Sequence, residues 1–380
     1  MTARPSALFY VQHLLGIGHL QRTLAIAAAA AEAGIDATVA SGGPAPSAPP
    51  NVRLIQLPPV RARDATFSTL VDEHGRAIDA AFEARRRDAL IAAFDAVAPD
   101  ILVTELFPFG RRMLRFELVP LLQRAAARTP RPRIVSSVRD ILVPSSPQKA
   151  ADMAAVARRW YDAVLVHGDP AVVRFDETFP PAGDIADLIR YTGYVAPPRP
   201  AQAPAREGVV VSAGGSAVGL SLLATAIAAR PLSRMKTAPW RILVGHGVPE
   251  SDFAILRAVA RTGVTVERVR PDFRALLGAA ALSISQAGYN TVMDVAASGP
   301  RAIFVPFYEE RQSEQALRAV RFGERFGYQH LAEADLEPAI LAAAIDRAMK
   351  TETRAAAIDL NGGPASAAAL LALMQTAASA

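Results

Sequence analysis

One segment of the chain, residues 282–319, constrains the fold more than any other. It contains an apolar run over 282–285, a turn at Gly288 and a helical pattern over 289–297. A second apolar run covers 302–306, and another helix start follows it. Two strand ends and two helix N-termini therefore open on one edge of a parallel sheet, where such sheets bind ligands. Helix N-termini at that edge attract phosphate, so the segment predicts a site for a phosphorylated ligand.

The same alternation of apolar runs and amphipathic stretches extends over the whole chain. A helix expected over 19–33 carries Leu20, Leu24 and Ala27 on one face, and Gly34 ends it. Alternating strands and helices predict a parallel sheet with helices on both faces. Further helices are expected over 78–97 and 220–229, and strands over 7–11, 37–40, 101–104, 134–138, 163–166, 209–212, 241–244 and 264–266.

A proline-rich stretch over 194–206 interrupts this pattern, which restarts after it. Its composition is typical of an extended, semi-rigid linker. We therefore expect an α/β chain of two Rossmann-like units joined by a hinge. The boundaries predicted from the sequence are an N-terminal domain over 1–194, a linker over 195–207, a C-terminal domain over 208–362 and a C-terminal helix over 363–380.

The composition narrows the class of protein. The 380 residues, 51% of them hydrophobic, suffice for two domains with full cores. The absence of cysteine excludes disulfides, thiolate metal sites and cysteine nucleophiles. No apolar run approaches the roughly 18 residues that span a bilayer, and the short polar N-terminus does not resemble a signal peptide, so a cytoplasmic location is expected. The net charge is +5, but the arginines are scattered and aromatic residues are only 6%, which argues against nucleic-acid binding.

A glycine-rich turn at 16–22, Gly-Ile-Gly-His-Leu-Gln-Arg, follows the first expected strand. It is not a dinucleotide fingerprint, because Gln21 replaces the third glycine and the second strand ends without an acidic residue. His19 lies near a helix N-terminus, whose dipole lowers the pKa of an imidazole and keeps it neutral as a base. His19 could instead simply cap the helix, and His13 is an alternative base.

Two other expected strands end in acidic residues, Glu105 and Asp140. Their carboxylates could orient an acceptor or tune His19, or they could form structural ion pairs with Arg111 or Arg139. An aromatic stretch follows Glu105 and is interleaved with arginines. Such a stretch is more often core beneath a solvated face than a membrane-contacting surface. Its members are Phe107, Phe109, Met113 and Phe116, with Arg111, Arg112 and Arg115.

The second half opens with Ser-Ala-Gly-Gly-Ser-Ala-Val-Gly over 212–219. Backbone N–H groups in such a turn, followed by a helix start, can cradle a diphosphate; a plain strand–helix turn is the alternative. The chain contains no Asp-x-Asp triplet and no P-loop, and its six histidines lack metal-binding spacing. Negative charge on a leaving phosphate would then be stabilised by helix dipoles, backbone amides and arginine, without a metal ion.

The segment 283–319 resembles the nucleotide-sugar site of MurG-type glycosyltransferases (family 28), and the turn at 16–22 resembles the first loop of nucleotide-sugar enzymes with that fold. The resemblance implies that Asp294 holds the ribose hydroxyls. In the family, a pair of glutamines contacts the sugar of the donor, and Glu314 and Gln315 occupy those two positions here. Because Glu314 departs from the pattern, the sequence does not identify the sugar. Arg270 occupies the family position whose backbone contacts the edge of the uracil ring. The other implied donor-binding residues are Gly18, Gly214, Gly215, Ser216, Gln286, Gly288, Tyr289, Asn290 and Thr291.

The resemblance covers essentially the whole chain and implies the GT-B architecture, in which two Rossmann-like domains with parallel sheets face each other across a cleft. It also implies that the C-terminal helix over 363–380 crosses back to the first domain. It implies an inverting, metal-independent transfer from a nucleotide sugar, which is UDP-linked in the family pattern, to a hydroxyl acceptor, with no further cofactor. His19 would be the base, with Glu105 and Asp140 beside it. The acceptor could be a glycan, a lipid-linked molecule or a small molecule. A nucleotide-sugar hydrolase or 2-epimerase, and a non-catalytic nucleotide-sugar-binding subunit, are the alternatives.

Overall fold

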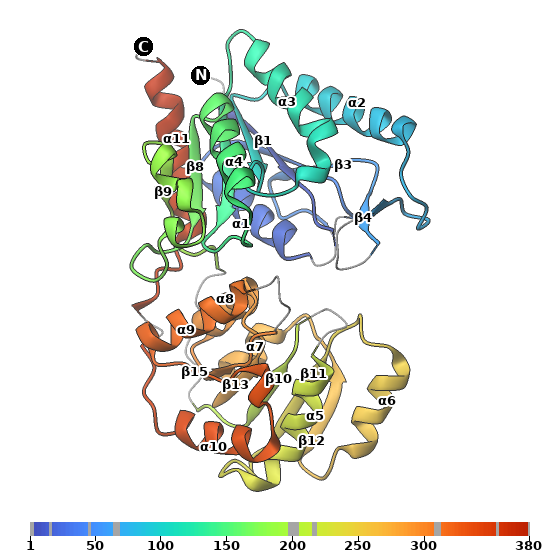
Figure 1. Ribbon diagram of the computed structural model, residues 1–380, viewed down its shortest axis with the longest axis vertical. Helices are drawn as coiled ribbons and strands as arrows, with labels where there is room; N and C mark the ends of the chain where they lie inside the picture. The colour runs from blue at the N-terminus through green and yellow to red at the C-terminus, as the bar shows by residue number, and fades with distance from the viewer. Residues whose placement is uncertain are drawn as a thin grey trace. The chain divides into compact units, whose positions relative to one another are not determined.

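The computed structural model describes residues 4–14, 17–44, 47–63, 69–196, 205–214, 219–307, 313–354 and 357–378. The chain divides into two compact units, each with its own parallel sheet (Figure 1). Unit 1 comprises Met1–Val195 together with Asn361–Ala380, and unit 2 comprises Ala196–Leu360.

Unit 1 is built on a seven-stranded sheet in the order β3-β2-β1-β6-β7-β8-β9, in which every neighbouring pair is parallel. The short strands β4 and β5 form a separate antiparallel pair. The strands are β1 (Ser6–Val11), β2 (Asp36–Ser41), β3 (Val52–Gln56), β4 (Arg61–Ala62), β5 (Leu70–Val71), β6 (Ile101–Glu105), β7 (Arg133–Arg139), β8 (Ala163–His167) and β9 (Ile189–Tyr191).

Helices cover both faces of this sheet, as alternation along the buried strands requires. Phe9 and Val11 of β1 share a core with α1 and α11, whereas Leu8 and Tyr10 point to the other face and share a core with α2 and α3. Helix α11, red in Figure 1, packs directly against α1 although it follows unit 2 in the sequence. The helices are α1 (Gly18–Glu32), α2 (Ala80–Val97), α3 (Arg115–Ala127), α4 (Pro147–Trp160) and α11 (Gly362–Ala378).

Unit 2 repeats the design with a six-stranded parallel sheet in the order β12-β11-β10-β13-β14-β15. Its strands are β10 (Val209–Ser212), β11 (Trp240–Val244), β12 (Val264–Arg268), β13 (Leu282–Ser285), β14 (Arg301–Phe304) and β15 (Gln329–His330). Its helices are α5 (Leu220–Ala229), α6 (Glu250–Val259), α7 (Phe273–Ala279), α8 (Tyr289–Ser298), α9 (Glu314–Phe326) and α10 (Pro338–Ala348). The predicted fold of two parallel-sheet α/β domains is confirmed.

Each sheet has one topological switch point, where the chain stops adding strands on one side and begins on the other. In unit 1 this point lies between β1 and β6, and in unit 2 between β10 and β13. Segments that leave the carboxyl ends of such neighbouring strands diverge and leave room for a ligand. The two glycine-rich turns, Glu105 and the segment that begins at Gln286 lie at the ends of these four strands, whereas Asp140, Arg270 and the Glu314–Gln315 pair follow β7, β12 and β14.

Two sequence expectations are refined by the structure. The helix expected from residue 78 begins at Ala80, because the Asp79 side chain accepts the Phe82 N–H at 2.7 Å and caps it. The aromatic stretch after β6 belongs to the core, since Phe107 and Phe109 are 1% and 5% exposed, and therefore does not offer these rings to a membrane. Among the described residues, no helix combines the length and apolar character needed to cross a bilayer.

Candidate functional site

The turn after β1 and the end of β6 meet at the switch point of unit 1. His19 is the second residue of α1, and Glu105 is the last residue of β6. The Nδ1 atom of His19 lies 2.6 Å from Oε1 of Glu105. The ring is therefore engaged with the neighbouring strand rather than capping its own helix, whose N-cap residue Ile17 makes no side-chain cap bond. Gly18 begins α1, whereas Gly16 lies outside the described residues.

The protonation state of this pair follows from its surroundings. Burial, together with the charges of Arg111 and Arg22, lowers the pKa of His19 to about 4 against the opposing effect of Glu105. Burial alone would raise the pKa of Glu105, but the interactions with His19, Arg22 and Arg111 outweigh it and lower the pKa to about 2. At neutral pH the carboxylate is charged and the ring is neutral, so the proton between them sits on Nδ1. Nε2 then carries the lone pair that can accept a proton, and the side chain keeps 21% of its surface exposed.

Two arginines surround the same carboxylate. Arg22 donates from Nη2 to Oε1 of Glu105 at 2.6 Å, and Arg111 places its Nη2 3.8 Å from Oε2. Glu105 therefore contacts both residues that the sequence offered as its partners, His19 and Arg111. A carboxylate held from several directions has little freedom to rotate, so it fixes the orientation of the imidazole.

Asp140 and His13 lie in the same edge region but in different surroundings. Asp140 is fully buried, and its Oδ1 accepts the N–H of Ile141 at 2.9 Å. A Cβ added to Gly168 would come within 2.6 Å of the Asp140 Cβ, which shows how closely the loop after β8 packs there. His13 is 6% exposed, and burial followed by the charge of Arg111 lowers its pKa.

His167 is a buried histidine that the sequence analysis did not select. It ends β8, as Glu105 ends β6, and its two ring nitrogens contact Ser137 Oγ at 2.7 Å and Thr192 Oγ1 at 2.9 Å. Burial, with a contribution from Arg22, lowers its pKa to about 3. Because both ring nitrogens form hydrogen bonds, His167 connects the end of β8 to Ser137 of β7 and to Thr192, which follows β9. Its position at the end of an apolar run was the signal that could have identified it.

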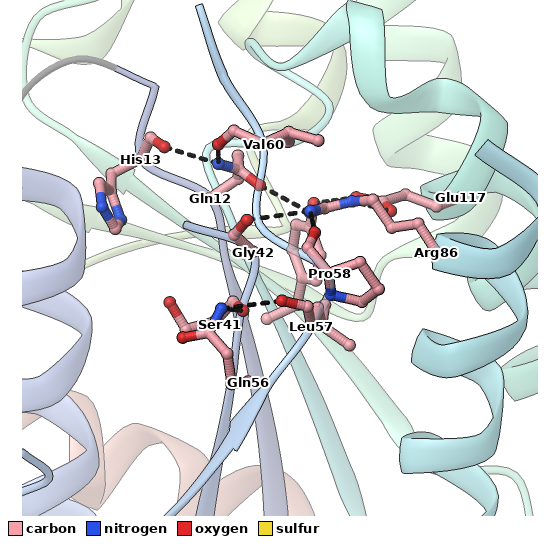
Figure 2. Close-up of polar contacts among 11 residues, drawn as sticks. Gln12, His13, Ser41, Gly42, Gln56, Leu57, Pro58, Val60, Arg86 and Glu117 are labelled. Atoms are coloured by element: carbon pink, nitrogen blue, oxygen red, sulfur yellow. Dashed lines mark hydrogen bonds and ion pairs between the residues drawn. The ribbon is translucent and has the colours of Figure 1, made fainter. Parts of the chain in front are cut away.

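A buried polar network supports the loop that carries His13 (Figure 2). Arg86 of α2 donates from Nε to Glu117 of α3 at 2.6 Å, from Nη2 to Gln12 at 2.6 Å and from Nη1 to the Gly42 carbonyl at 2.9 Å. Gln12 in turn donates to the carbonyl of His13 at 2.6 Å. Arg86 and Glu117 form an ion pair in which both side chains are 0% exposed. The network thus joins two helices to the loops after β1 and β2.

The corresponding loops of unit 2 follow β10 and β13. Gly214 and Gly219 have φ angles of +77° and +94°, which side chains other than glycine adopt at a cost. A Cβ on Gly219 would lie 3.0 Å from Nε2 of Gln286, so the glycine-rich loop packs on the turn after β13. A Cβ on Gly288 would meet no atom within 4 Å, which leaves open space at the N-terminus of α8. Gly215 and Ser216 lie outside the described residues.

Helix α9 holds the turn after β13 from two sides. The side-chain oxygen of Gln315 accepts the N–H groups of Ala287 at 3.1 Å and Phe307 at 3.2 Å. The fully buried Arg318, which the sequence analysis did not select, donates to the Ala287 carbonyl at 3.1 Å and stacks on the ring of Tyr289. The Tyr289 side chain is itself buried, at 5% exposure. The side-chain oxygen of Gln315 is occupied by backbone N–H groups.

Asp294 lies on α8, and its burial raises its pKa to about 6 although the charge of Arg274 opposes the shift. Arg270 follows β12 and is engaged by Asp272 at 2.7 Å and by Glu267 at 3.3 Å. Its side chain is therefore committed to neighbouring carboxylates. The other predicted residues, Asn290, Thr291 and Glu314, are partly buried in the first turns of α8 and α9.

Comparison with known proteins identifies the family of unit 2. Residues 209–369 match the glycosyltransferase family 28 C-terminal domain. The chain is a glycosyltransferase with a family 28 C-terminal domain. No curated protein matches the sequence.

Solved structures resemble this glycosyltransferase over its whole length and share its GT-B fold. MurG of Acinetobacter baumannii matches with a TM-score of 0.58 and 14% identity, over 99% of this chain and 100% of that one. The calicheamicin glycosyltransferase CalG4 matches with a TM-score of 0.60 and 16% identity, over 99% and 98% of the two chains. LpCGTa, solved in complex with UDP, matches with a TM-score of 0.59 and 17% identity, over 99% and 95%.

Among the residues that the structure describes, no three His, Asp or Glu side chains gather closely enough to hold an ion. The polar groups at the two switch points are instead guanidinium, imidazole and amide groups with single carboxylates, a set suited to binding phosphate and moving a proton.

Proposed function

We propose that this glycosyltransferase is an inverting, metal-independent enzyme that transfers a sugar from a UDP-linked donor to a hydroxyl group of an acceptor. The observation that carries the proposal is the 2.6 Å contact between His19 Nδ1 and Glu105 Oε1 at the switch point of unit 1. This contact leaves Nε2 as the basic nitrogen, and the lowered pKa of His19 keeps it unprotonated at neutral pH.

In the proposed step, Nε2 of His19 accepts the proton of the acceptor hydroxyl while the oxygen attacks the anomeric carbon. A bond forms between that oxygen and the anomeric carbon, and the bond from the anomeric carbon to the diphosphate oxygen breaks. UDP leaves with the electron pair, so a single displacement inverts the anomeric centre. Glu105 stabilises the imidazolium that forms, as a buried carboxylate does for a histidine base. Asp140 is proposed to shape the acceptor side of the site.

We propose that unit 2 binds the donor. Asp294 accepts hydrogen bonds from the ribose hydroxyls, and the backbone of Arg270 contacts the base. The loop from Gly214 through Ser216 and the N-terminus of α8 hold the diphosphate through backbone N–H groups and the helix dipole. The sugar lies near Glu314 and Gln315. The open space beside Gly288 supports this arrangement, because a phosphate can approach the backbone there.

A product analysis tests this function. The enzyme is incubated in EDTA with a panel of UDP-sugars and a cell extract that contains hydroxyl acceptors. UDP release is measured by chromatography, and the anomeric configuration of the product by NMR. The proposal expects a glycoside of inverted configuration. Free sugar formed at a catalytic rate without acceptor would indicate a hydrolase, and activity that returns only with magnesium or manganese would contradict metal independence.

A further inference from the structure

Arg111 presents an unused hydrogen-bonding edge inside unit 1. Its side chain is only 9% exposed, and its Nε and Nη2 atoms have no hydrogen-bond partner in the described part of the chain. These two N–H groups lie on the same edge of the planar guanidinium, the edge that binds two oxygens of a carboxylate or phosphate at once. A buried guanidinium with this edge unfilled is costly unless a ligand or ordered water completes it.

Other polar atoms near Arg111 also lack hydrogen-bond partners among the described residues. They are Nδ1 of His13 and Oε2 of Glu105, both buried. Oε2 lies 3.8 Å from Nη2 of Arg111, which is too long for a hydrogen bond. The charge of Arg111 helps to lower the pKa of His13, which places the two groups in electrostatic reach of each other. Two unsatisfied donors of Arg111 and one unsatisfied acceptor of Glu105 therefore lie next to His19.

The balance of charge points to a negatively charged occupant. Glu105 is already paired with Arg22 at 2.6 Å, so its charge is largely compensated before Arg111 is counted. Burial lowers the pKa of Arg111 most; Glu105 and Tyr10 oppose the shift, and the like charges of Arg139 and Arg22 add to it. An incoming anion would relieve this repulsion and fill the free edge of the guanidinium.

The backbone is built to hold Arg111 in this position. Arg111 and Leu106 both adopt left-handed conformations, with φ angles of 59° and 65°. Residues other than glycine are rarely found there unless the surrounding structure enforces it. The buried side chains of Leu106, Phe107 and Phe109 provide that support.

We propose that Arg111 binds an anionic group of the acceptor, a carboxylate or a phosphate monoester. The designation of the ligand as an acceptor rests on the proposed transferase function, whereas the anion subsite itself does not. An anion on Arg111 would anchor the acceptor beside Glu105, and a hydroxyl elsewhere in the same molecule would reach Nε2 of His19.

Three small probes with the same carbon skeleton test the subsite: glycerol, glycerate and glycerol 3-phosphate. Their binding to the full-length protein is measured by NMR titration in saturating UDP, which occupies the phosphate site proposed in unit 2. Glycerate or glycerol 3-phosphate is expected to bind at least about tenfold more tightly than glycerol, and the stronger of the two identifies the anion class. Arg111→Gln should weaken that binding about tenfold or more.

Two further variants make the test specific. Arg111→Lys keeps the charge but cannot form two parallel hydrogen bonds to the anion, so its affinity for the anionic probe should fall several-fold. It replaces Arg111→Gln in the test if that variant does not fold. Arg112→Gln removes the same charge one residue away, where the side chain is 39% exposed and 3.9 Å from Asp152, and should bind the probes like the wild type. Equal binding of glycerol and both anions, or unchanged anion binding in both Arg111 variants, would overturn the subsite. UDP binding, measured in the same samples, reports separately on the proposed donor site.

Discussion

At the residue scale, His19 is the side chain whose chemistry depends most on its neighbours. Burial and two nearby arginines keep it neutral, while Glu105 fixes which nitrogen carries the proton. A free carboxylate or a free imidazole in water would have neither the lowered pKa nor the fixed proton position of this pair. The site therefore separates two roles that a free histidine combines, since one nitrogen is a structural donor and the other is a base.

His19→Ala is expected to lower kcat by about 10²–10⁴-fold, the usual contribution of a positioned general base. UDP affinity should stay within about twofold of the wild type, because His19 belongs to unit 1 and the proposed nucleotide site to unit 2. Stopped-time assays of UDP release and calorimetric titration with UDP measure the two effects. A variant that keeps full activity would move the base to His13 or Asp140, and loss of UDP binding would make His19 a phosphate ligand.

Asp294 shows the opposite electrostatic situation, because burial raises its pKa from 3.8 to about 6. The folded protein holds this proton more tightly than the unfolded chain does. Relative to a neutral side chain, stability therefore falls as the pH rises from about 4 to about 6 and stays constant above. Asp294→Asn should raise the free energy of unfolding by about 1–3 kcal/mol at pH 8 and change it little at pH 4.

Urea denaturation at the two pH values checks this prediction for Asp294. Asp88→Asn is a suitable control because that side chain is 65% exposed, and it should leave the pH dependence unaltered. A residue that costs stability while it binds a ligand is typical of a functional site. If Asp294→Asn stabilised the protein equally at pH 4 and pH 8, the carboxyl would not be titrating as described.

At the element scale, the strands next to the switch points were predictable because they are short, largely apolar runs. Strand β13 and helix α5 have the predicted bounds. Strand β9 was missed, because its residues are partly exposed and carry no such pattern. The Arg86–Glu117 pair could not be predicted, since charged residues on amphipathic helices ordinarily face solvent and nothing local marks these two as partners.

That buried pair should be a strong structural element. Arg86→Met leaves Glu117 buried without its partner and is expected to destabilise unit 1 by about 3–5 kcal/mol. Arg124→Met breaks an exposed ion pair with Asp95 that joins the same two helices, and should cost under about 1 kcal/mol. Free energies of unfolding from urea titrations compare them. Similar losses in both variants would mean that the buried network does not hold α2 and α3 to the loops after β1 and β2.

At the scale of the whole molecule, the chain crosses back to unit 1 after completing unit 2. Leu370 of α11 is fully buried in the core shared with α1. Leu370→Ala should therefore destabilise unit 1 by about 2–5 kcal/mol. Ala368→Ser, at an exposed position of the same helix, should stay within about 0.5 kcal/mol of the wild type.

Hydrogen exchange followed by mass spectrometry locates the effect of Leu370→Ala. Faster exchange is expected in the strands of unit 1, with β10 to β14 of unit 2 unchanged, because α11 packs on α1. Faster exchange confined to unit 2 would contradict the packing of α11. The composition of this helix, rich in small residues, indicated a helix in the sequence, and the family resemblance implied that it crosses back to the first domain. The tertiary contacts show that it packs on α1 there.

The central claim, that unit 2 is a metal-independent UDP-sugar site, is tested most directly by calorimetric titration of UDP in EDTA. The wild type should bind UDP without metal, Asp294→Ala should bind it about ten- to a hundredfold more weakly through the loss of a charged hydrogen-bond pair, and His19→Ala should bind it as the wild type does. Binding that requires a divalent metal, or an Asp294→Ala variant with unchanged UDP affinity, would contradict the account.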